Sequence, residues 1–366
     1  MQMRKLPQGD EQISVIGLGL GIAKPGVDDV SGLVAGALER GINFFDLCCA
    51  YESSYALLKA PLAEVPRSSF FTQLHLGATY KNGDYAFSRK LEKVRDTFMH
   101  ELEITGIGYT DFGMLHCIDE EKDLDYVLTK GIYQLAQDLK AQGIIRHLGF
   151  STHNPAIARK LLELGGFDLF MFSINAAFDF QQDGELALGE TSEREELYRL
   201  AEAKKVAISV MKPFAGGQLL NAQSSPIGVP LSVVQCLKYV LDRPAVVTAI
   251  AGAAKVEELD DYLKLFTASE KELDYGAAMA HATQAPNLKR CVYCNHCAPC
   301  PKKLNVGLIN KYYDLALMGD NLAREHYLNL EHHASECNDC GHCVKRCPFK
   351  CDQIARMHEI AAYFDR

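Results

Sequence analysis

Residues 144–164 read IIRHLGFSTHNPAIARKLLEL, a stretch that contains one complete strand-and-helix unit. The run Ile144–Phe150 has the length and the largely apolar character of a buried strand. Asn154 follows where a helix N-cap is favoured, and Pro155 stands at the first helical position, where its missing N–H costs nothing. The stretch therefore predicts a strand that leads directly into a helix.

The same unit recurs along the first 285 residues. Strand-length apolar runs, each followed by a segment of 3.6-residue periodicity, are expected at Ile13–Gly17, Ile42–Asp46, Phe70–Gln73, Phe112–His116, Ile144–Phe150, Leu169–Ile174, Val206–Val210 and Val246–Ile250. Alternating units of this kind over about 250 residues fit a (β/α)₈ barrel better than an open doubly wound sheet. We therefore expect an α/β fold, with a TIM barrel over residues 1–285.

The glycines Gly17, Gly19 and Gly21 suggest part of a dinucleotide-binding fingerprint. The third glycine of that fingerprint is missing at the required spacing, because Ile22 follows instead. We therefore favour a tight bend after the first strand over a Rossmann fold.

Nine of the 13 cysteines fall between Cys291 and Cys351. In a reducing cytosol such density indicates metal ligands rather than disulfides. They form two runs, CVYCNHCAPCP and CNDCGHCVKRCP. The second run has the full bacterial ferredoxin spacing, and the first shortens the last gap by one residue.

In two-cluster ferredoxins the fourth cysteine of each run binds the other cluster. The expected ligand sets are Cys291, Cys294, Cys297 and Cys347 for one 4Fe-4S cluster, and Cys337, Cys340, Cys343 and Cys300 for the other. Zinc is the alternative, since paired CxxC units also form structural zinc sites. Cys351 is left over. Residues 286–366 are thus predicted to form a small α-helical, ferredoxin-like domain with a helical insert and a C-terminal helix.

Charge and hydropathy exclude several classes of function. The net charge of −9 provides no basic field for nucleic acid. No apolar run approaches the ~18 residues of a membrane span, and the first residues lack the apolar core of a signal peptide. We expect a cytoplasmic protein.

Polar residues and one glycine stand at the ends of the predicted strands, where barrel enzymes carry their chemistry. These strand-end residues are Asp46, Gln73, His116, Ser151, Asn175, Lys212 and Gly252. Polar groups at the ends of apolar strands are costly to bury unless they are paired, so a shared pocket is expected.

Several segments are similar to those of the aldo/keto reductases, in order, over residues 3–268. They include INFFDLCCAYESS at 42–54, TDFGMLHCID at 110–119 and ISVMKPFAGGQL at 208–219. The resemblance implies NAD(P)H-dependent reduction of a carbonyl. It also implies that Tyr51 is the general acid, that His116 orients the carbonyl, and that Asp46 pairs with a lysine.

That lysine is missing from the expected place. In the family it ends the third strand, where this chain reads FFTQLH with Gln73. A nearby cation favours the phenolate form of tyrosine, whereas a neutral amide only forms hydrogen bonds. Either another cation such as Lys212 supplies the charge, or the pocket does not carry out the usual proton transfer.

The resemblance also implies sites for a nicotinamide cofactor, NADP(H) or NAD(H). Ser151 and Asn175 would face the nicotinamide, with Gly252 at the same strand ends. Lys212, Gly217 and Leu219 would flank the pyrophosphate, and Lys255 would lie near a 2′-phosphate. Cys48, Cys49 and Cys117 lie just beyond Asp46 and His116, either as reactive thiols or as packing at the barrel rim.

A barrel of this family with a ferredoxin-like tail resembles a prokaryotic branch of the aldo/keto reductases. It implies an iron–sulfur oxidoreductase that acts on a small organic substrate at the barrel mouth. NAD(P)H, or a ferredoxin or flavodoxin-type carrier, would supply the electrons. The alternatives are an electron-transfer or complex subunit whose barrel no longer reduces carbonyls, and clusters with only a structural role.

Overall fold

Eight parallel strands form a closed barrel in the computed structural model, which describes residues 1–180, 191–279, 291, 297, 299–317, 323–347 and 351–365. The barrel strands are β3 (Ile16–Gly19), β4 (Phe44–Asp46), β5 (Phe71–Leu76), β8 (Thr110–Leu115), β9 (Ile145–Thr152), β10 (Leu169–Ser173), β11 (Ala207–Met211) and β12 (Val246–Gly252). Strand β4 pairs with both β3 and β5, which closes the sheet. The predicted (β/α)₈ barrel is confirmed.

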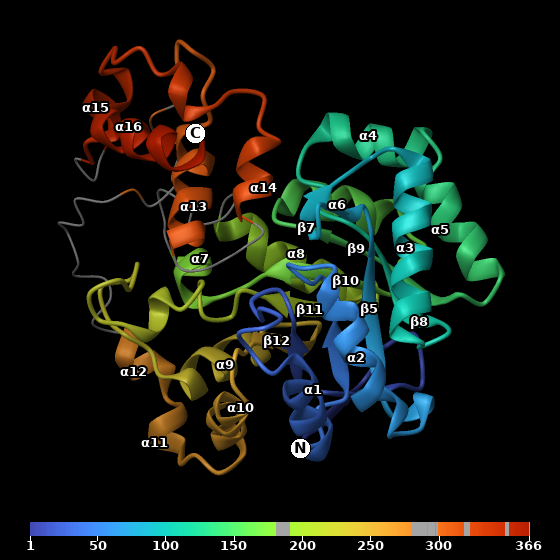
Figure 1. Cartoon of the computed structure of the whole chain (residues 1–366). Coiled ribbons are helices and arrows are strands. Elements are labelled where there is room, and N and C mark those ends of the chain that lie inside the picture. Colours follow the sequence, from blue (N-terminus) through green and yellow to red (C-terminus); the bar gives the residue numbers. More distant parts are fainter. Residues whose placement is uncertain are drawn as a thin grey trace.

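Helices surround this barrel (Figure 1). They are α1 (Val30–Glu39), α2 (Ser53–Ala63), α3 (Leu91–Thr105), α4 (Glu121–Thr129), α5 (Ile132–Ala141), α6 (Pro155–Leu164), α7 (Ala176–Phe180), α8 (Thr191–Ala203), α9 (Val233–Leu241), α10 (Val256–Leu263), α11 (Glu270–Leu273) and α12 (Tyr275–Met279). Helix α6 begins as predicted, since the Asn154 side chain accepts hydrogen bonds from the N–H groups of Ala156 and Ile157.

The predicted strands differ from the observed ones by one to three residues at their ends, and the first and third differ most. The run Ile13–Gly17 divides between β2 (Gln12–Ser14), which pairs with β1 (Met3–Lys5), and barrel strand β3. The third strand was expected to end at Gln73, whereas β5 continues to Leu76. Gln73 therefore lies within the strand and not at its end. Its side chain points into the barrel, where it contacts Met171 and Ser209.

A hairpin that the sequence interpretation missed extends the sheet beyond β5. It consists of β6 (Ala78–Lys81) and β7 (Asp84–Phe87). Asn82 and Gly83 connect them with φ angles of 56° and 87°. Both central residues thus have positive φ, as a type I′ turn requires.

The described C-terminal residues form a second group of helices with a hydrophobic core of its own. These helices are α13 (Val306–Leu317), α14 (Ala323–Leu328), α15 (His342–Arg346) and α16 (Gln353–Phe364). In Figure 1 they lie at one end of the barrel, with α14 next to β7. Helices α13 and α14 lie where the helical insert was expected, and α16 lies where the C-terminal helix was expected. The proposed boundary near residue 285 lies outside the described residues.

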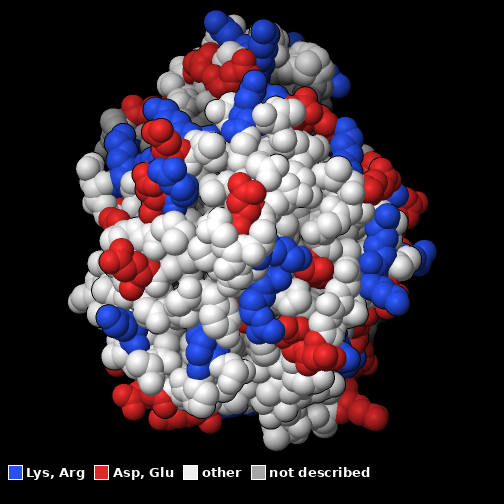
Figure 2. All heavy atoms as spheres, turned by 90° about the vertical axis from the view of Figure 1, so that its right-hand side faces the viewer, with Lys and Arg blue, Asp and Glu red and all other residues white. Residues whose placement is uncertain are grey.

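The surface shows no single-sign field on the face drawn in Figure 2, where basic and acidic side chains are interspersed. Among the described helices, none has the length and apolarity that crossing a membrane requires.

Candidate active site

The carboxylate of Asp46, at the end of β4, is buried and held by two residues of β5. Gln73 Nε2 donates to Asp46 Oδ1 at 2.9 Å, and His75 Nε2 lies 2.8 Å from the same oxygen. Ser209 donates to Gln73 Oε1 at 2.9 Å, which fixes the amide with its NH₂ group toward the carboxylate. In the described part of the chain, no lysine or arginine bonds to Asp46.

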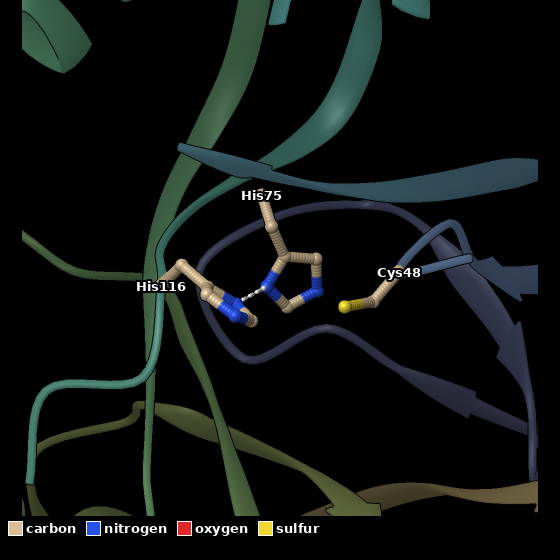
Figure 3. A group of neighbouring side chains, drawn as sticks. All are labelled: Cys48, His75 and His116. Atoms are coloured by element: carbon tan, nitrogen blue, oxygen red, sulfur yellow. Dashed lines mark hydrogen bonds between the residues drawn. The ribbon is translucent and has the colours of Figure 1, made fainter. Parts of the chain in front are cut away.

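A chain of hydrogen bonds continues from His75 to the rim of the barrel. Its Nδ1 lies 2.9 Å from His116 Nδ1, and His116 Nε2 lies 2.6 Å from the Tyr85 hydroxyl. Figure 3 shows His75 between His116 and Cys48, with one ring nitrogen facing His116. The chain thus links strand β4 to hairpin strand β7 through β5 and the end of β8.

The donors in this chain follow from the chemistry of its ends. An ionised Asp46 only accepts, so His75 Nε2 carries hydrogen and its Nδ1 accepts. His116 Nδ1 must then donate, which leaves His116 Nε2 to accept from the Tyr85 hydroxyl. Every ring nitrogen of the two imidazoles has a partner in this arrangement.

Burial keeps the outer members of the chain neutral. Loss of solvation, with the nearby His75 adding to it, lowers the pKa of His116 well below its usual value. Burial also raises the pKa of the Tyr85 hydroxyl well above its usual value. Tyr85 therefore keeps its proton, and His116 is an uncharged acceptor.

The hydrogen-bond partners of His116 are residues other than Tyr51. Both ring nitrogens of His116 are bonded to other residues, one to His75 and the other to Tyr85. The backbone of Tyr51 instead forms a β-bridge with Asp84 in the hairpin. The role of Tyr51 as the general acid stays a prediction, and Tyr85 is a tyrosine whose hydroxyl bonds to His116.

Gln73 is one of two residues of β5 that contact Asp46, the expected partner of the family's lysine. Gln73 and His75 alternate on the same face of β5, and both reach Asp46. His75 lies two residues closer to the carboxyl end of the strand and is the one that connects to His116. The sequence interpretation missed it because it ended the strand too early.

Two groups of side chains have the composition of a metal site. Cys48, His75 and His116 offer ligand atoms within 4.8 Å of one another, and so do Cys117, Asp119 and His153. In the first group every imidazole nitrogen is already hydrogen-bonded. Burial, with Asp46 nearby, also raises the pKa of the Cys48 thiol, so this sulfur is a neutral packing group rather than a reactive thiolate.

The second group lies at the barrel rim beyond β8. His153 Nδ1 lies 2.9 Å from Asp119 Oδ2, and the N–H of His153 donates to Asp119 Oδ1 at 2.6 Å. These hydrogen bonds from His153 hold the pKa of Asp119 below its usual range despite burial. Burial lowers the pKa of His153 to about 4. Cys117 Sγ lies 3.6 Å from Asp119 Oδ2, and burial raises the pKa of this thiol.

Part of the predicted nucleotide site surrounds a groove of about 440 Å³. Lys212, Gly217 and Gly252 line it, and Leu219 and Lys255 do not. Leu219 is fully buried in the barrel core. The groove has two acidic residues that were not predicted, Glu258 and Asp261 from α10.

Ser151 and Asn175 are buried at their strand ends and bond to the backbone. Ser151 Oγ accepts from the N–H of Cys117 at 2.7 Å. Asn175 Nδ2 donates to the carbonyl of Lys212 at 2.9 Å, and its Oδ1 accepts from the N–H of Phe178 at 3.0 Å. Both side chains thus brace the loops that follow β8, β10 and β11.

The C-terminal cysteines that were assigned to one cluster lie around one cavity. Cys300, Cys337, Cys340 and Cys343 all line it, together with hydrophobic residues such as Leu304 and Met357. No three of these four sulfur atoms lie within 4.8 Å of one another. In the other predicted set, Cys294 lies outside the described residues, and Cys347 Sγ accepts from the N–H of Cys351 at 3.4 Å.

The model of the aldo/keto reductase family matches residues 17–231, more than half of the chain. The chain belongs to the aldo/keto reductase family. It is therefore an oxidoreductase, with a C-terminal segment beyond the part that the family model matches.

Known proteins agree with this assignment. The uncharacterized oxidoreductase YqkF of Bacillus subtilis is 24% identical over 307 residues, covering 78% of this aldo/keto reductase and 97% of the relative. Among solved structures, the aldo-keto reductase AKR11C1 from Bacillus halodurans matches with a TM-score of 0.60 and 18% identity, over 77% of this chain and 96% of its own. The glycerol dehydrogenase AKR11B4 from Gluconobacter oxydans matches with a TM-score of 0.59 and 19% identity, over 78% of this chain and 97% of its own.

Proposed function

We propose that this aldo/keto reductase interconverts a small carbonyl compound and its alcohol at the carboxyl end of the barrel. Its electrons come from NAD(P)H or pass through iron–sulfur clusters from a one-electron carrier. The observation that carries the proposal is the hydrogen-bonded chain from Asp46 through His75 and His116 to Tyr85. A chain of this kind moves a proton between the barrel rim and a buried carboxylate.

Carbonyl reduction adds a hydride to carbon and a proton to oxygen. A bound nicotinamide supplies the hydride. When Asp46 carries a proton, each hydrogen bond of the chain runs in the opposite direction. His116 Nε2–H then donates to the Tyr85 oxygen, and the Tyr85 hydroxyl is free to protonate the substrate. With Asp46 ionised, the same chain withdraws the Tyr85 proton, which leaves a base for alcohol oxidation. The chain therefore serves both directions.

The C-terminal segment supports a cluster rather than a single metal ion. One zinc ion with Zn–S bonds of about 2.3 Å would hold its sulfur atoms about 3.8 Å apart. A 4Fe-4S cluster binds each thiolate to a different iron, so its ligands stand further apart. Cys300, Cys337, Cys340 and Cys343 line one cavity and so offer the four thiolates that one such cluster needs.

The groove beside Lys212 supports a nucleotide. Ala215, Gly216 and Gly217 have positive φ angles of 51°, 66° and 86°, which lets the backbone approach a ligand closely. Lys212 provides a positive charge at the same place. Glu258 and Asp261 lie on α10 at this groove, and a carboxylate there suits a ribose 2′-hydroxyl better than a 2′-phosphate. These contacts favour NAD(H) over NADP(H).

The lack of a lysine or arginine at Asp46 favours a second function, in which the chain is an electron-transfer or complex subunit. The variants Gln73→Lys and His75→Lys separate the two functions, because each places an ammonium near Asp46. If either variant raises carbonyl reduction by more than tenfold, the native pocket is not built for that reaction. If both lower it, His75 already serves the native reaction.

The proposed function is tested on protein purified without oxygen. We expect about eight iron atoms per chain, as two 4Fe-4S clusters require. NADH and NADPH are then added separately while the visible absorbance of the clusters and the reduction of a panel of aldehydes and oxo acids are followed. Turnover that survives in both Tyr85→Phe and His116→Ala would contradict the proposed site.

A further inference from the structure

The C-terminal segment places a buried lysine over the barrel mouth. Lys311, on α13, is 4% exposed. Its Nζ lies 5.8 Å from the centroid of the Phe178 ring, on the short helix α7 that follows β10. A cation from outside the barrel thus reaches the carboxyl end of its strands.

This ammonium has no anionic partner among the described residues. Asp119 is the acidic residue whose charge acts on it, but that carboxylate is already bonded to His153 and to the Thr152 hydroxyl. Burying an unpaired ammonium is costly, so a chain that retains one in such a place has a reason to do so.

A second lysine lies near the same helix, because Asn175, which directly precedes α7, donates to the carbonyl of Lys212 at 2.9 Å. Lys212 directly follows β11 and has a φ of 60°. Within the described ranges, its ammonium also bonds to no acidic side chain. The two lysines repel each other, and together with burial this repulsion lowers the pKa of Lys311 to about 7. His326 of α14 and His153 add neutral imidazoles, since burial lowers the pKa of His326 to about 3. The described part of the mouth therefore places two lysines against one acidic side chain, Asp119.

We propose that Lys311 and Lys212 form an anion site at the barrel mouth and that the substrate is an organic anion, a carbonyl compound with a carboxylate or phosphate group. The inference rests on the proposed function and adds the class of substrate. It assigns the C-terminal segment a direct part in binding that substrate.

The position of Lys311 favours the substrate over the nucleotide as the source of the anion. Lys212 lines the nucleotide groove, whereas Lys311 does not. The charges of both lysines act on Cys117 and His326, which adjoin His116 and Tyr85. An anionic group held between the two lysines therefore lies on the side of the groove where the proton chain ends.

The test measures binding without turnover. The anaerobic holoprotein is titrated with oxalate and with inorganic phosphate in a calorimeter. We expect at least one of them to bind, and Lys311→Gln to weaken its binding at least tenfold. Lys204→Gln, which removes an exposed lysine at the end of α8, should leave the affinity within twofold. Absence of binding to the wild type, or unchanged affinity in Lys311→Gln, would overturn the proposal.

Two further measurements keep the result decisive. Lys212→Gln should weaken the same anion even if Lys311→Gln loses iron or unfolds, and an unchanged affinity there counts against the site. NADH and the anion should bind together; mutual exclusion would assign the site to the nucleotide pyrophosphate and overturn a substrate site. Oxalate binding that persists in a catalytically inactive His116→Ala protein separates this inference from the reaction itself.

Discussion

His75 and His116 face each other through their Nδ1 atoms, 2.9 Å apart, with ring planes at 87°. Two bare lone pairs at this distance would repel, so one of the two nitrogens carries the hydrogen. The tautomers of the two rings are therefore coupled, and the hydrogen bonds to Asp46 and Tyr85 change together with them.

Replacing His75 should interrupt proton transfer along the chain and leave substrate binding at the barrel mouth unchanged. In His75→Phe we expect kcat to fall by about 10²-fold or more, a typical loss of acid–base assistance, while KM stays within threefold. His100→Gln, an exposed histidine on α3, is the matched control. Steady-state kinetics at several pH values measure both parameters, and an unchanged kcat in His75→Phe would rule out the chain.

The two tyrosines give opposite expectations for the general acid. Tyr85 bonds directly to His116, so Tyr85→Phe should lower kcat more than Tyr51→Phe does. Single-turnover measurements with saturating nucleotide compare the two variants. A larger loss in Tyr51→Phe would restore the assignment that the family resemblance implies, with Tyr85 as a positioning residue.

The cysteine cavity predicts a specific loss of iron. Cys340→Ser removes one of four expected ligands of a single cluster, so the iron content should fall by about half in the purified protein. Cys236→Ala, a buried cysteine of α9 outside the tail, should leave iron unchanged. Full iron content in Cys340→Ser, or zinc in place of iron, would contradict the predicted ligand set.

Anion binding should weaken as the pH rises through about 7, the lowered pKa of Lys311. The anion needs the ammonium form, which is present below that pKa and lost above it. The charged groups near Lys311 are Lys212, Asp119 and Arg194, and the neutral titratable groups near it are Cys117, His153 and His326. Calorimetric titrations with oxalate from pH 6 to 9 measure the dependence, and a flat affinity in this range would exclude Lys311 as the titrating group.

The same shift has a consequence for stability with a defined sign. The pKa of Lys311 is lower in the folded protein than in the unfolded chain, where 10.5 is normal. The unfolded chain therefore binds more protons between these values, and folding becomes more favourable as the pH rises from about 7. Lys311→Met should raise the thermal midpoint at pH 7 and flatten its dependence on pH in this interval.

Asp261 should discriminate between the two nicotinamide nucleotides. Asp261 lines the groove and pairs with Lys264, and we expect its carboxylate to disfavour a 2′-phosphate there. Asp261→Asn should strengthen NADPH binding several-fold and leave NADH within twofold, as measured by fluorescence titration. The adjacent Asp260 bonds to Arg40 and is absent from the groove lining, so Asp260→Asn is the matched control. Equal effects of the two variants would contradict the prediction.

The barrel was predictable because its strands are apolar runs and its helices carry clear signals. Asn154 and Pro155 mark the start of α6 in the sequence and in the structure. The polar positions inside the barrel were harder to predict, because Gln73 and His75 interrupt the apolar run of β5 and so resemble a strand end. Their function depends on which face of the strand each occupies, and only alternation along the full length of β5 shows this.

Two site residues were missed for different reasons. Tyr85 is carried by the β6–β7 hairpin, whose Asn82-Gly83 turn is a strong sequence signal that was passed over. Lys311 has no local signal at all. It becomes important only because α13 packs onto the barrel, a contact between residues more than a hundred positions apart along the chain.

The rings of Tyr85 and His326 lie 5.7 Å apart, and His326 also stacks on Tyr312. A tail helix thus rests on the hydroxyl-bearing residue at the outer end of the proton chain. We expect oxidation of the tail cysteines to lower the activity of the barrel if it displaces this helix, although the barrel's own residues stay intact. Removing only α13 to α16 would take away these ring contacts, so it would alter the barrel site rather than only shorten the protein.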